Sequence, residues 1–134
     1  MKTRRESREI IMIALYQKYI CDSNKIPYDI DNIIKSLIEE PNEFVSDSVH
    51  NIIEKTNIID ELINKYLNNW TIDRLGKTDQ AILRLATYEI LYTDTPGVVV
   101  IDEAIELSKQ YSDDKVKNII NAVLDNILKN EVKN

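Results

Sequence analysis

Basic side chains gather at the start of the chain, where Lys2, Arg4, Arg5 and Arg8 follow one another closely. On an ideal α-helix, Arg4, Arg5 and Arg8 lie about one turn apart on a shared side. Tyr16 follows Arg5 by 11 residues, or about three turns, and therefore points in nearly the same direction. Recognition of single-stranded RNA needs guanidinium groups that bind phosphates and an aromatic ring that stacks on bases. The pattern favours an RNA-binding face on the first helix.

The alternative interpretation is that the charged residues at the start of this helix are merely solvated. The distribution of charge along the chain bears on this choice. The whole chain has a formal net charge of −6, which argues against nucleic-acid binding over its whole surface. Residues 1–25, however, hold six basic and three acidic residues, while the remaining chain holds 11 basic and 20 acidic ones. A local positive patch on an acidic body can bind a polyanion at one place and repel it elsewhere.

Catalytic chemistry has little support in the sequence. His50, the only histidine, lies within a predicted helix and has no nucleophile near it in sequence. Cys21 is the only cysteine, which excludes an intramolecular disulfide and a cysteine-rich metal site. Neither a glycine-rich phosphate loop nor the spacing of metal ligands is present. We therefore expect no enzymatic activity, no catalytic residue, no cofactor and no metal site.

Length and composition indicate one helical domain. The chain has 134 residues, enough for a real core, and contains only two glycines and three prolines. The sequence shows no signal peptide and no apolar run long enough to span a membrane. Together with the single cysteine, these features lead us to expect a cytoplasmic protein without membrane contact.

Apolar residues recur at helical spacing throughout the chain and predict an all-α fold of six or seven helices. The Val-Val-Val-Ile run at 98–101 also fits a strand, but it has no partner strand and the helical period continues beyond it. We expect helices at about 3–21, 29–39, 42–70, 78–92, from 98 to a break at 111–114, and at 115–129, with a tight link over 71–76.

Two of these helices are expected to have special roles. Beginning at Asn42 as N-cap, the apolar positions of the third helix recur every 3.5 residues, which predicts one continuous helix packed in a bundle. The helix at 78–92, with Thr78 as N-cap, is apolar on nearly every side and is expected at the centre of the core. Arg84 and Glu89 within it are therefore expected to find their partners inside the protein.

Three stretches, in this order and spacing, make the sequence resemble the NusB transcription antitermination factor family. The first is RRESRE at 4–9 followed by ALY at 14–16, and the second is DRL at 73–75 followed by DQAILRLATYEI at 79–90. The third is Pro96 followed by VIDEAIELS at 100–108 and NAVLD at 121–125. The resemblance covers almost the whole chain and implies two packed helical subdomains, at about 1–70 and 71–134.

The resemblance also implies a function. Members of this family pair with the ribosomal protein NusE, bind the single-stranded boxA element of ribosomal RNA operons and help the transcription elongation complex to read through terminators. The residues expected to lie on or near RNA are Lys2, Arg4, Arg5, Arg8, Tyr16, Lys115 and Lys117. Asp73, and Asp79 at the exposed start of the central helix, are expected to face NusE.

Three alternatives stay open at this point. The same fold serves as the RNA-binding module of ribosomal RNA methyltransferases, but 134 residues leave no room for a methyltransferase domain, so we expect no such activity. The chain is also consistent with a helical interaction module that binds a basic partner without RNA. A homodimer that covers the arginine face is the third alternative.

Overall fold

The computed structural model describes residues 2–132, which form seven α-helices and one 3₁₀ turn, and no strand occurs in that range. The all-α prediction is confirmed, and the valine run at 98–101 lies inside a helix. The elements are α1 (Arg4–Ser23), α2 (Ile30–Leu37), α3 (Glu43–Glu54), α4 (Thr56–Tyr66), η1 (Ile72–Arg74), α5 (Lys77–Tyr92), α6 (Gly97–Tyr111) and α7 (Asp114–Glu131).

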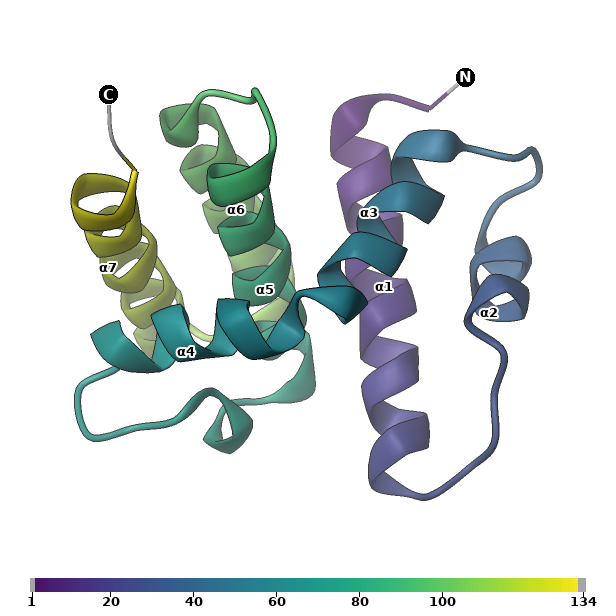
Figure 1. Cartoon of the computed structure of the whole chain (residues 1–134), viewed down its shortest axis with the longest axis horizontal. Helices are drawn as coiled ribbons and strands as arrows, with labels where there is room; N and C mark the ends of the chain where they lie inside the picture. The colour runs from purple at the N-terminus through teal and green to yellow at the C-terminus, as the bar shows by residue number, and fades with distance from the viewer. Residues whose placement is uncertain (1, 133–134) are drawn as a thin grey trace.

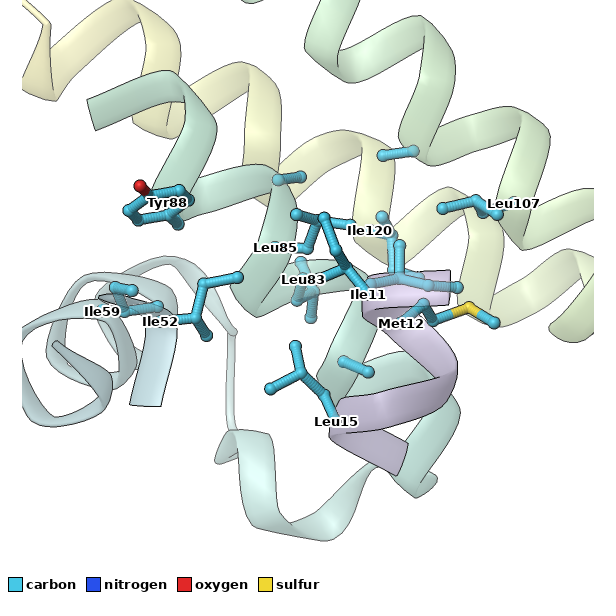
Figure 2. Close-up of a cluster of buried hydrophobic side chains, with 14 of the residues drawn as sticks. Ile11, Met12, Leu15, Ile52, Ile59, Leu83, Leu85, Tyr88, Leu107 and Ile120 are labelled. Atoms are coloured by element: carbon cyan, nitrogen blue, oxygen red, sulfur yellow. The ribbon is translucent and has the colours of Figure 1, made fainter. Parts of the chain in front are cut away.

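Helix α5 is the centre of the molecule, as its pattern predicts. Residues 80–90 are all buried, and α5 packs against α1, α3, α4, α6 and α7. Figure 1 shows α1, α2 and α3 on one side and α4, α6 and α7 on the other. The core around α5 draws side chains from both sides, as Figure 2 shows for Ile11, Met12, Leu15, Ile52, Ile59, Leu83, Leu85, Tyr88, Leu107 and Ile120.

The prediction of one long third helix is wrong, because the helix is interrupted at Lys55, which separates α3 from α4. The Thr56 hydroxyl donates a hydrogen bond to the Ile52 carbonyl at 2.8 Å, and such back-bonding favours a bend. Helix α3 packs on α1, whereas α4 turns away to pack on α5 and α7 (Figure 1). The apolar period continues through the break, so the pattern alone does not reveal the change of direction.

The start of α5 also differs from the prediction. Its N-cap is Gly76 rather than Thr78, and no side chain caps it. A Cβ atom at Gly76 would lie 3.0 Å from Oδ2 of Asp79, so glycine leaves room for this carboxylate to turn back toward the helix start. Asp79 therefore lies where its charge complements the helix dipole. The predicted cap at Asn42 is confirmed, with its Oδ1 accepting from the Val45 amide at 3.1 Å.

The division into subdomains at about residue 70 stays a prediction. Helix α4 lies before that boundary but packs on α5 and α7, which lie after it. Within residues 2–132, no helix is both long enough and apolar enough to cross a membrane.

Candidate nucleic-acid interface

A capping box fixes the first turn of α1. The Thr3 hydroxyl accepts a hydrogen bond from the Glu6 amide at 3.1 Å, and Glu6 accepts one from the Thr3 amide at 2.9 Å. The hydrogen bond from the Thr3 backbone is the main cause that holds the pKa of Glu6 below its usual value. Glu6 thus stabilises the start of the helix that carries the arginines, although its negative charge interrupts the basic run.

The Arg5 side chain extends from this turn toward α6. Its Nε donates to Glu103 at 3.0 Å and its Nη2 at 3.5 Å. The Arg5 side chain is still 67% exposed, whereas Glu103 is 19% exposed. The carboxylate therefore orients a guanidinium that keeps much of its surface in solvent.

The Arg4 side chain extends from the same turn in another direction, toward α3. Its guanidinium carbon lies 3.8 Å from the centre of the Phe44 ring, in the first turn of α3. Lys2, which precedes the helix, is exposed. Lys2, Arg4 and Arg5 thus form the exposed basic set at the start of α1, here called the basic tip.

Arg8 is buried and is not part of the basic tip, although the sequence led us to expect it near RNA. The residue is 6% exposed, and its Nε and Nη2 donate to the two carboxylate oxygens of Glu89 at 2.8 and 2.9 Å. This hydrogen-bonded pairing raises the pKa of Arg8 above its usual value. Arg4 contacts α3 and does not share a side with Arg5, whereas Arg5 and Arg8 line the same cavity beside α6, as the predicted shared side requires. Arg8 joins α1 to α5, and the internal partner expected for Glu89 is confirmed.

A second internal ion pair lies near the middle of α5. Arg84 donates to the two oxygens of Asp60 in α4 at 2.7 and 2.9 Å, as well as to Gln80 at 3.1 Å. Its guanidinium carbon also lies 4.8 Å from the centre of the Tyr19 ring in α1. The internal ion pair predicted for Arg84 is confirmed, and it connects three helices.

Tyr16 and two lysines are the remaining residues predicted near RNA. Tyr16 is 39% exposed on α1. Lys115 is exposed and Lys117 is partly buried, 3.7 Å from the Asp114 carboxylate, both in the first turns of α7. The hydroxyl of Tyr111, at the end of α6, donates to Glu9 of α1 at 3.1 Å. The turn between α6 and α7 therefore lies beside α1.

The two predicted partner-facing acids differ in exposure. Asp73 is exposed in η1, where it accepts a hydrogen bond from the Thr71 hydroxyl. Asp79 is half-buried rather than exposed, and it accepts one from the Ser112 hydroxyl in the turn before α7. Burial raises the pKa of Asp79 above its usual value, although the Ser112 hydrogen bond opposes that shift.

Three residues that the sequence did not single out for these roles determine this geometry. Glu103 orients Arg5, Phe44 supports Arg4, and Glu89 removes Arg8 from the surface. Each lies more than 35 positions from its arginine, so no local spacing reveals the pairing. Elsewhere, His50 lies 2.7 Å from Asp31 on the surface, and residues 2–132 contain no group of three or more metal-binding side chains.

Known proteins resemble this chain over nearly its whole length. A family model for the NusB family matches residues 5–129. The transcription antitermination protein NusB of Staphylococcus aureus strain JH9 is 44% identical over 130 residues, covering 95% of this chain and 99% of that protein.

Solved structures agree with the sequence match. T. maritima NusB superposes with a TM-score of 0.84 at 35% identity, covering 97% of this chain and 94% of that one. A chain from a crystal structure of the antitermination factors NusB and NusE with dsRNA gives a TM-score of 0.78 at 25% identity, covering 94% of this chain and 96% of that one. The helices that carry the basic tip and the two internal ion pairs are thus those of a known fold, and the chain belongs to the NusB family.

Proposed function

We propose that this protein is an RNA-binding transcription antitermination factor that pairs with the ribosomal protein NusE and binds boxA RNA of ribosomal RNA operons. The observation that carries the proposal is the basic tip on an acidic chain, where Arg4 and Arg5 are exposed and held in place. Membership of the NusB family supports it, as does the similar solved chain that is named with NusE and dsRNA.

In this proposal, phosphates of single-stranded RNA bind Lys2 and Arg5, and Tyr16 supplies a ring for stacking. Lys115 and Lys117 extend the positive surface from the turn beside α1. Arg8 contributes by holding α1 on α5, and it does not touch RNA. Because phosphate contacts release counterions, affinity falls steeply as salt rises, with a log–log slope of roughly −0.7 per phosphate for a single strand.

The proposed partner surface is acidic. Asp73 is exposed for a basic ribosomal protein, and half-buried Asp79 lies beside the turn that precedes α7. Binding of NusE there would place partner and RNA on neighbouring surfaces, from which the pair joins the transcription elongation complex. A homodimer that covers the basic tip would oppose RNA binding, so light scattering with and without RNA belongs to the test.

The test is fluorescence anisotropy of a labelled boxA-type RNA, with and without NusE, at two salt concentrations. We expect Arg5→Glu to weaken binding at least tenfold, since it removes one phosphate contact and adds a repelling charge. Lys25→Glu is the matched control: it makes the same change in charge beyond the other end of α1, about 30 Å away. Equal binding by the two variants would contradict the proposed interface.

The second candidate is a helical module that binds a basic partner without RNA. It is favoured by the acids around the basic tip: a cavity of about 210 Å³ is lined by four glutamates, Glu6, Glu9, Glu103 and Glu106, as well as by Arg5 and Arg8. If a pull-down recovers the same amount of NusE with and without RNA, and the protein does not bind RNA at low salt, this candidate is favoured over the first.

A further inference from the structure

Arg4 differs from the two arginines that follow it on α1. Arg5 and Arg8 are both held by carboxylates, whereas the Arg4 side chain forms no ion pair or hydrogen bond with any residue in 2–132. Its contact is the face of Phe44, 3.8 Å from the guanidinium carbon to the ring centre. Arg4 therefore keeps its full charge and all its N–H donors while an aromatic ring limits its movement.

Two helix caps hold Arg4 and Phe44 together. The capping box of Thr3 and Glu6 begins α1 directly before Arg4, and Asn42 begins α3 two residues before Phe44. The Asn42 side-chain amide also lies 3.5 Å from the hydroxyl of Ser7, a buried residue of α1. The starts of the two helices are thus tied to each other, and Phe44 packs partly against the core.

The contact leaves a planar group available for stacking. The guanidinium carbon of Arg4 lies over the Phe44 ring, and Arg4 is exposed to solvent. Unpaired RNA bases stack on arginine planes as well as on aromatic rings. Restricting the arginine before RNA arrives lowers the entropy lost on binding.

We propose that Arg4 and Phe44 form one platform on which an unpaired RNA base stacks, with Arg4 touching the base and Phe44 acting as its positioning residue. This inference rests on the proposed RNA binding and adds to it a specific kind of contact. Arg5 and Lys2 would bind phosphates, whereas Arg4 would bind a base. The two kinds of contact respond differently to salt and to removal of a base.

The test compares four variants by anisotropy with the same boxA-type RNA. Phe44→Leu keeps an apolar side chain but removes the ring, and we expect about two- to fivefold weaker binding, the fold-change that corresponds to an exposed cation–π contact. Phe44→Tyr keeps the ring and should bind within about twofold of the unmodified protein. Arg4→Lys keeps the charge without the plane and should weaken binding as Phe44→Leu does. Combining Arg4→Lys with Phe44→Leu should add little to either change.

Two further readouts separate stacking from simple loss of charge or of folding. The salt dependence should be unchanged in Phe44→Leu and Arg4→Lys, because neither removes a positive charge. RNAs with one abasic position, tested position by position, should reveal one base whose removal weakens binding to the unmodified protein but not to Arg4→Lys. Arg4 lies on the surface, so this arm remains decisive even if Phe44→Leu reduces stability.

The results that overturn the platform differ from those that overturn RNA binding. If Arg5→Glu weakens RNA binding while Arg4→Lys binds like the unmodified protein, the platform is wrong and the interface stands. The platform is also wrong if no abasic position distinguishes the unmodified protein from Arg4→Lys. If the unmodified protein does not bind the RNA even with NusE at low salt, the proposed function itself fails.

Discussion

Two arginine–glutamate pairs join α1 to the rest of the protein, and they differ chiefly in burial. Arg8 and Glu89 have side chains that are 7% and 1% exposed, whereas Arg5 and Glu103 are 67% and 19% exposed. In both pairs the arginine donates from Nε and Nη2 to the glutamate carboxylate, which lies on α5 in the buried pair and on α6 in the exposed one. The chemistry of the two pairs is the same, so what distinguishes them is their surroundings.

The comparison teaches that burial, rather than residue type, distinguishes these arginines, and in the proposed function it divides them between structure and binding. A buried charge whose partner is removed remains desolvated, which makes the Arg8 pair difficult to break. An exposed pair is screened by water and contributes little to stability, so the Arg5 pair can exchange its carboxylate for a phosphate. Arg5 and Arg8 are three positions apart along α1, yet only Arg5 belongs to the basic tip.

The largest expected effect breaks the buried pair. Glu89→Ala should lower the free energy of unfolding by about 3–5 kcal/mol, because the Arg8 guanidinium would stay buried without its partner. Glu103→Ala is the matched variant on the exposed pair and should lower it by less than about 1 kcal/mol. Urea unfolding followed by circular dichroism measures both. Equal losses would show that burial is not what separates the two pairs.

The next prediction asks whether Arg8 acts only in the structure. Replacing both partners together, Arg8→Met with Glu89→Leu, removes the buried charges and fills the space with apolar groups. Such replacements are often neutral or stabilising, so we expect the double variant to recover most of the stability lost in Glu89→Ala. It should bind boxA-type RNA as the unmodified protein does, at equal salt. A stable double variant with much weaker RNA binding would return Arg8 to the RNA-binding set.

The exposed pair should respond in the opposite way. Glu103→Gln removes a negative charge beside Arg5 while it keeps the shape of the side chain. We expect RNA affinity at low salt to rise by about two- to fivefold, with a change in unfolding free energy below about 0.5 kcal/mol. The gain should shrink as salt rises, because screening weakens the charge that was removed. A lower affinity would mean that Glu103 helps RNA binding by orienting Arg5 more than it competes with phosphate.

Asp79 lies between these extremes of burial, and its expected effect on stability is small and depends on pH. Burial raises its pKa, so the folded protein binds a proton more readily at Asp79 than the unfolded chain does. Its contribution to stability is therefore favourable at low pH and is lost as pH rises from the unfolded pKa through the folded one. Asp79→Asn should remove this pH dependence. At neutral pH, its free energy of unfolding should equal that of the unmodified protein or exceed it by less than about 1 kcal/mol.

Unfolding of Asp79→Asn and the unmodified protein at several acidic and neutral pH values measures this difference. Asp73→Asn, at an exposed acid, is the control and should show no such change with pH. Both variants should bind NusE more weakly if the proposed acidic partner surface is correct. Identical pH dependence of Asp79→Asn and the unmodified protein would contradict the burial effect.

The sequence by itself determined most of the helices of this protein. Helix periodicity and capping depend on residues three or four apart, so they can be read locally. The central position of α5 followed from its apolar residues, and the cap at Asn42 followed from its place before α3. The resemblance to the NusB family likewise rested on local stretches in order, and it is confirmed.

Only the tertiary structure decided which partners the charged residues contact. Glu89 lies 81 residues from Arg8, Glu103 lies 98 residues from Arg5, and packing alone brings them together. The bend at Lys55 was likewise hidden, because the apolar period runs through it while α3 packs mainly on α1 and α4 packs on α5 and α7. A pattern along one helix gives the direction of a side chain relative to that helix. Whether that direction leads to water, to a carboxylate or to an aromatic ring depends on segments that are distant in sequence.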